Sequence, residues 1–173
     1  MADEVQPPPA AGLARSTLGE RLGGFIYGTI IVLAVVVAGA KAYPDQAGQV
    51  AALVAVTSVV FWLAHVYAHG LAHSIARDEH LSLAALLTIA RREGAIVEAA
   101  LPPVAALLLG AFGLVSTAVA VWLAVGLGLL VLAVQGITFA RVERLGPLAT
   151  LGVVAANLGL GVVLVGLKLL LSH

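Results

Sequence analysis

The sequence has no cysteine and is poor in charged and aromatic residues. The absence of cysteine excludes disulfide bonds and thiolate ligation of metals or iron–sulfur clusters. Only 10% of the 173 residues are charged and 5% are aromatic, whereas 61% are hydrophobic. A soluble domain carries about 25% charged residues. Together with a mean hydropathy of +1.09, this composition indicates an integral membrane protein.

The few charges balance, since nine Lys and Arg residues face nine Asp and Glu residues. No long basic run is present, so nucleic acid is not expected as a partner. The apolar content is mostly Ala, Val, Leu and Gly, and small residues let helices approach closely in a bilayer. We therefore expect the lipid bilayer as a partner, and self-association into a homo-oligomer is an open alternative.

Two regions differ in composition. Residues 1–20 are polar and contain three consecutive prolines at 7–9. Such a segment buries too little apolar surface to fold, which predicts a disordered cytoplasmic tail. No apolar run precedes Leu22, so these residues do not have the pattern of a secretory signal peptide. Residues 21–173 are predicted to form an all-α, polytopic membrane helix bundle.

Five apolar segments are each long enough to cross a hydrocarbon core of about 30 Å, which takes about 20 helical residues. They cover residues 22–40, 50–75, 94–114, 117–142 and 147–170. A shorter segment, residues 81–90, is predicted to form a helix at the membrane surface. In the first segment, Gly24 and Gly28 form a small-residue face that suits a close helix neighbour.

Length and turn residues define the boundary between the third and fourth segments. Residues 99–140 contain no charged side chain, and one straight helix of that length would measure about 60 Å, twice the hydrocarbon thickness. Gly113 is suited to end one helix, and Ser116 or Thr117 to cap the next. The proline pair at 102–103 is expected to kink the third segment or to mark its first turn.

The distribution of arginine predicts the orientation. Five spans place the termini on opposite sides of the membrane. With the N-terminus inside, the cytoplasmic side collects Arg15, Arg21, Arg77, Arg91, Arg92, Arg141 and Arg144. The outer side keeps only Lys41 and Lys168. Because cytoplasmic loops are enriched in Lys and Arg, we expect a cytoplasmic N-terminus in a multi-pass protein of the cell membrane.

The second segment carries three histidines at four-residue spacing. His65, His69 and His73 fall on one face of a helix. Ionisable groups at membrane depth are costly to bury, which makes them functional candidates. We predict that His65 and His69 contact Glu98 of the third segment and form a polar centre with it.

Other polar residues are expected to support this centre. Three of them are predicted in the cytoplasmic half of the bundle, where polar groups should face one another instead of lipid: Tyr27, Gln135 and Asn157. Structural anchoring roles are expected for Arg21, Phe25 and Trp62. Arg21 would hold the first segment at the inner interface.

Three classes of function fit these residues. The first is permeation or transport of a proton or small cation, with the histidines and Glu98 as a relay. The second is a divalent metal site, in which His65 and His69 form an i, i+4 pair and Glu98 is a third ligand. The third is a non-catalytic structural or partner-binding subunit. A haem held by two histidines would need a second ligand from another residue or another subunit, because the histidines of the spanning segments all lie on one helix. The sequence lacks a Gly-x-Ser-x-Gly motif, which favours a non-enzymatic role.

Two patterns resemble small integral membrane proteins of actinobacteria. One is Arg-x-x-x-Phe-Ile-Tyr-Gly-Thr at residues 21–29, and the other is Trp-Leu-Ala-His-Val-Tyr-Ala-His at residues 62–69. The resemblance covers most of the chain. It implies a membrane location and no assigned activity.

A more distant resemblance is to the lysosomal-type potassium channel family. The first helix of that family opens with Arg-x-x-x-Phe-Ser-Asp-Gly, and Arg21, Phe25 and Gly28 match this pattern, with Ile and Tyr in place of Ser and Asp. Trp62 shortly before His65 is similar to its second helix. The resemblance implies a tetrameric channel whose first helix lines the pore. Its apolar constrictions would fall at Ile30, Ile31 and Ala34.

Overall fold

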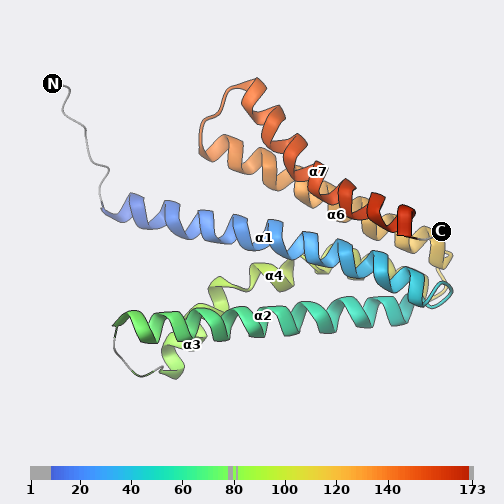
Figure 1. The fold of residues 1–173 in the computed structure, drawn as a ribbon, viewed down its shortest axis with the longest axis horizontal. Coiled ribbons are helices and arrows are strands. Elements are labelled where there is room, and N and C mark those ends of the chain that lie inside the picture. Colours follow the sequence, from blue (N-terminus) through green and yellow to red (C-terminus); the bar gives the residue numbers. More distant parts are fainter. Residues whose placement is uncertain (1–8, 78–79, 81, 172–173) are drawn as a thin grey trace.

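The structure is a computed structural model, and it describes residues 9–77, 80 and 82–171 (Figure 1). In this part of the chain every regular element is an α-helix, as the sequence predicts. The helices are α1 (Pro9–Ala42), α2 (Ala47–Arg77), α3 (Leu83–Arg92), α4 (Ala95–Glu98), α5 (Leu101–Ala111), α6 (Thr117–Val142) and α7 (Pro147–Leu171).

Three helices are long and apolar enough to cross a membrane. They are Leu18–Ala42 of α1, Ala47–Ala76 of α2, and Thr117–Val142, which is α6. A bent pair, Leu83–Glu98 with Leu101–Ala111, turns by 49° and makes a fourth candidate. The apolar part of α7 whose side chains are described, Pro147–Val163, is shorter than a span. The helices are therefore compatible with a membrane bundle of three or four spans, and the fifth span stays a prediction.

The helices run back and forth along one axis, with α1 between the others. Figure 1 shows α2 on one side of α1 and the α6–α7 pair on the other. Correspondingly, α1 packs against α2, α4, α6 and α7. The end of α1, the start of α2 and the connection α5–α6 lie at one end of the bundle, and the end of α2, the start of α3 and the connection α6–α7 at the other (Figure 1). We call these the α1–α2 end and the α2–α3 end.

The first helix begins earlier than the composition suggests. The structure continues α1 back to Pro9 and so into the predicted tail, of which residues 1–8 lie outside the described residues. A proline is tolerated at this position because the first N–H groups of a helix have no partner within it.

Turn residues end and begin helices where the sequence predicts. Gly113 adopts a positive φ of 73° just after α5, a conformation that costs glycine little. The Ser116 hydroxyl accepts a 3.3 Å hydrogen bond from the Val119 amide and caps α6. The two prolines lie in the first turn of α5, directly after the bend from α4. The predicted break between the third and fourth segments is thus confirmed.

The apolar core fills the half of the bundle towards the α1–α2 end. Three side chains in the middle of α1, Val32, Leu33 and Val36, are at most 1% exposed. Residues from three other helices complete this core: Val50, Ala51 and Val54 of α2, Ala106 and Leu107 of α5, and Ala124 and Val125 of α6. Polar chemistry is therefore confined mainly to the other half.

The predicted small-residue face on α1 is used for close packing against α4. A Cβ atom at Gly28 would lie 3.0 Å from the Cα and carbonyl oxygen of Ile96, and one at Gly24 would lie 3.3 Å from the Cβ of Ala95. Only glycine lets the two backbones approach this closely. This contact fixes α4, and with it the α3–α4 corner, beside α1 and α2.

Candidate functional site

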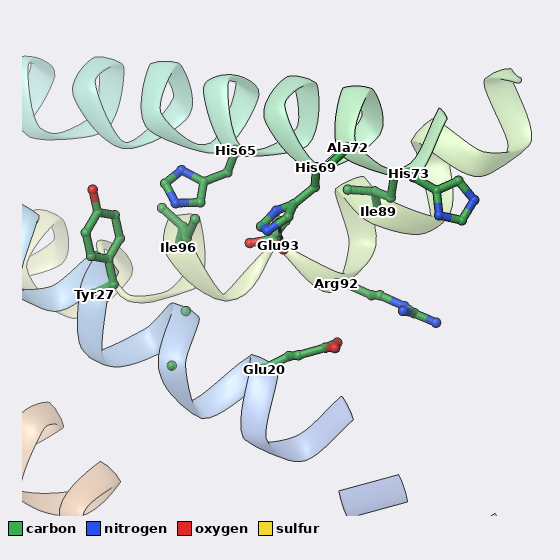
Figure 2. Close-up of a pocket in the computed structure, with 12 residues that line it drawn as sticks. Glu20, Tyr27, His65, His69, Ala72, His73, Ile89, Arg92, Glu93 and Ile96 are labelled. Carbon is green, nitrogen blue, oxygen red and sulfur yellow. Dashed lines mark ion pairs between the residues drawn. The ribbon is translucent and has the colours of Figure 1, made fainter. Parts of the chain in front are cut away.

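A cleft of about 590 Å³ opens between α1, α2 and the α3–α4 corner (Figure 2). Its lining includes seven ionisable side chains. They are Glu20 and Tyr27 from α1, His65, His69 and His73 from α2, and Arg92 and Glu93 from the corner. The predicted histidine stripe therefore faces a cavity shared by three parts of the fold.

His69 is paired with a carboxylate inside this cleft. Its Nδ1 lies 3.1 Å from Oε1 of Glu93, and the side chains are 57% and 19% exposed. Because a carboxylate only accepts hydrogen bonds, Nδ1 carries the proton. When the imidazole is neutral, Nε2 is then an acceptor. Glu93 follows the last turn of α3, where its backbone N–H donates to the carbonyl of Ile89, so the end of that helix positions the carboxylate.

His65 is held in the same manner by a backbone group. Its Nδ1 donates to the carbonyl oxygen of Phe61, one turn back, at 3.1 Å. Figure 2 shows the rest of its ring pointing away from α2 into the cleft. The ring centre lies 5.2 Å from that of Tyr27 and 6.1 Å from that of His69. Four side chains of the cleft lining are thus successive neighbours, in the order Glu93, His69, His65 and Tyr27.

Glu98 does not join this chain, and the predicted contact between it and a histidine is absent from the described structure. Arg21 donates through Nη2 to Oε2 of Glu98 at 2.9 Å. This ion pair joins α1 to the end of α4, and the predicted role of Arg21 as an anchor at the inner interface stays a prediction. Among the residues that the structure describes, no group of three His, Asp or Glu side chains could hold a metal ion, so His65, His69 and Glu98 do not form a metal centre by themselves.

Glu93 takes the role that the sequence suggested for Glu98 because of how α3 and α4 meet. The corner between α3 and α4 brings Glu93 to His69, while Glu98 lies at the end of α4 and pairs with Arg21. Glu93 directly precedes the predicted segment 94–114, and this position at a segment boundary was the signal that the sequence offered.

The other predicted residues divide between the cleft and elsewhere. Tyr27 lines the cleft. Asn157 of α7 donates a hydrogen bond to the backbone carbonyl of Leu132 in α6 at 3.4 Å, and Gln135 is half-buried on α6. Figure 1 shows the α6–α7 pair across α1 from α2, which carries the histidines, and neither of these two residues lines the cleft.

The two aromatic anchors have different surroundings. The indole N–H of Trp62 donates to the carbonyl of Ala90 at 2.9 Å and ties α3 to α2. This bond holds the wall of the cleft that carries Glu93. Phe25 is half-buried, and its carbonyl accepts a 2.7 Å hydrogen bond from the Thr29 hydroxyl within α1.

Comparison of the chain with known protein families, curated proteins and solved structures finds no match. The resemblances to actinobacterial membrane proteins and to lysosomal-type potassium channels therefore remain predictions. The chemistry of the cleft is the observation from which a function can be argued.

Proposed function

We propose that this chain is a multi-pass protein of the cell membrane that moves protons, and that the cleft beside α2 is its proton-accepting site. The observation that carries the proposal is the His69–Glu93 pair, with 3.1 Å between Nδ1 and Oε1, in a cleft that His65 and Tyr27 extend inwards. Histidine and carboxylate groups near membrane depth are typical members of proton relays.

The composition of the cleft favours a proton over other small cations. A proton needs only a chain of donors and acceptors, and the Nδ1 bonds leave Nε2 of His65 and His69 available as acceptors. A metal cation needs three or four converging ligands, which the described residues do not provide by themselves.

The cleft alone does not cross the bundle. Beyond Tyr27 and His65, towards the α1–α2 end, the core around Val32, Leu33 and Val36 is closed. Transport therefore requires either a second conformation or a path between chains. A homo-oligomer, as the channel resemblance implies, belongs to the proposal for this reason.

Proton flux into liposomes tests the proposal. The full chain is reconstituted with a pH-sensitive dye inside, and a potassium gradient with valinomycin drives proton entry. The variant His69→Gln removes the paired imidazole, and His80→Gln is the matched control because His80 is exposed and outside the cleft lining. We expect at least a tenfold loss of flux for His69→Gln and wild-type flux for His80→Gln. Wild-type flux at the level of empty liposomes would contradict the proposal.

A divalent metal site is the second candidate, and the histidine hydrogen bonds favour it. Metal-bound histidines usually donate their other ring N–H to a carboxylate or a carbonyl, and His69 and His65 do so towards Glu93 and Phe61. The same preparations are analysed for bound zinc. About one zinc per chain, lost in His65→Ala/His69→Ala, without proton flux would establish this candidate. Neither flux nor metal would leave a structural or partner-binding subunit.

A further inference from the structure

A second cavity, of about 290 Å³, lies beside the cleft at the α2–α3 end and is lined by Glu20, Arg21, Thr88, Arg91 and Arg92. We infer that this cavity binds the phosphate of an anionic phospholipid headgroup. The inference rests on the charge, the depth and the apolar surroundings of the cavity, and it does not depend on proton transport.

The charge of the lining suits a phosphate. Three guanidinium groups meet one carboxylate, that of Glu20. Arg21 uses one nitrogen to bind Glu98 and keeps its other donors. Within the described part of the chain, neither Arg91 nor Arg92 forms an ion pair. Guanidinium groups match phosphate oxygens with paired hydrogen bonds, so a phosphate would supply the acceptors that these side chains lack.

The depth of the cavity matches the headgroup layer. The apolar run of α1 is bounded by Arg21 and Lys41, twenty residues apart and hence separated by about 30 Å along the helix. This is the thickness of the hydrocarbon core. If α1 spans the membrane, Arg21 lies where lipid phosphates lie. Arg91 and Arg92 line the same cavity and therefore share that level.

The surroundings favour a lipid over a soluble phosphate. On α3, Leu83 is 72% and Leu87 is 52% exposed, and this helix has no buried residue. Leu87 precedes Arg91 by one turn and lies on the same face. An amphipathic helix with basic residues at its polar edge is typical of the membrane interface, and basic pockets between membrane helices bind anionic headgroups. Acyl chains would cover the leucines while the phosphate binds the arginines.

Thermal unfolding of the full chain in neutral detergent tests this inference. Phosphatidylglycerol is titrated in, phosphatidylcholine serves as the neutral lipid, and glycerol phosphate as the soluble source of phosphate. The test variant is Arg91→Gln/Arg92→Gln. The control is Arg141→Gln/Arg144→Gln, which removes the same charge from the last turn of α6 and the turn that follows it, outside the cavity.

We expect phosphatidylglycerol to raise the unfolding temperature of the wild type saturably, because a ligand that binds the folded state stabilises it. An arginine near an anionic surface contributes a factor of about five in affinity. The test variant should therefore bind roughly 25-fold more weakly, and the control like the wild type. The single variants Arg91→Gln and Arg92→Gln, each weakened about fivefold, give the same answer if the double variant does not fold.

Three outcomes would overturn the inference. Equal stabilisation by phosphatidylcholine would show that the effect needs no net negative charge on the lipid. Equal weakening of the test and control variants would show attraction to surface charge in general and no site at this cavity. An equal effect of glycerol phosphate at the same concentration would assign the cavity to a soluble phosphate compound instead of a lipid.

Discussion

The close contact between α1 and α4 predicts that Gly28→Ala destabilises the bundle. The added Cβ would lie 3.0 Å from Cα and the carbonyl oxygen of Ile96 and 3.2 Å from Cβ of Ala99. Carbon atoms pack best at about 3.5–4.0 Å, so α4 must move by about 0.5 Å or more. Overpacking of this kind costs about 1–3 kcal/mol. Replacing glycine by alanine inside a helix contributes about 1 kcal/mol in the opposite direction.

The matched control is Gly126→Ala on α6, because a Cβ there has no neighbour within 4 Å. It gains the same helix propensity without the clash, so the two variants should differ by about 1–3 kcal/mol. For a chain of this size, 1 kcal/mol changes the unfolding temperature by about 2–4 °C. Thermal unfolding in detergent should therefore place Gly28→Ala roughly 2–12 °C below Gly126→Ala. Equal unfolding temperatures would refute the packing of α1 on α4.

Three further predictions concern the helix connections and the topology. Trp62→Phe should lower the free energy of unfolding by about 1 kcal/mol, because it removes the hydrogen bond from the indole N–H to the Ala90 carbonyl of α3. Trp122→Phe is the control and should leave that free energy unchanged, since Trp122 is exposed. Denaturation in detergent compares the two variants. Ser116→Ala should cost about 1 kcal/mol through loss of the cap of α6, and the same assay would show no change if the hydroxyl is not the cap. In intact cells, a membrane-impermeant maleimide should label Asp45→Cys from outside and Gly146→Cys only after permeabilisation; the reverse pattern would contradict a cytoplasmic N-terminus.

Local signals in the sequence were sufficient for the helices and for several of their ends. Hydropathy and length predict the cores of α1, α2 and α6, because a long apolar run has few alternatives to a helix. Gly113 and Ser116 define the break between α5 and α6 through backbone conformation and side-chain capping, both of which depend on single residues. The close approach at Gly28 likewise follows from the absence of a side chain.

The tertiary arrangement of the site was harder to predict. His65 and His69 were predicted to contact Glu98, but the carboxylate that pairs with His69 is Glu93, and Glu98 pairs with Arg21. Which carboxylate reaches His69 depends on the turn between α3 and α4, and hydrophobic periodicity in the sequence does not predict the geometry of that turn. Asn157 was also predicted to join the polar centre, but its amide donates a hydrogen bond to the backbone carbonyl of Leu132. A polar side chain in an apolar helix can bond to a neighbouring backbone in this way without contacting the other polar side chains.

The structure separates the bundle into two functional halves. Close-packed aliphatic side chains fill the half towards the α1–α2 end, and ionisable side chains line an open cleft in the other half. The core around Val36 keeps water and ions from crossing a single chain. The cleft extends inwards as far as Tyr27 of α1 and His65 of α2. Tyr27 follows Arg21 by six residues, or roughly 9 Å along α1. The proposed proton transport requires a site of this kind in one of its states, open towards one end of the bundle and closed towards the other.

The measurement that tests the central claim most directly is water access to the cleft from each side of the membrane. The chain has no cysteine, so single cysteines report their own positions. Ala72→Cys lies in the cleft lining, and Ala51→Cys lies in the core, where Ala51 is 3% exposed. An impermeant maleimide should label Ala72→Cys in inverted vesicles but not in intact cells, and Ala51→Cys in neither. Labelling of Ala72→Cys from the outer side, or from neither side, would contradict a one-sided aqueous cleft.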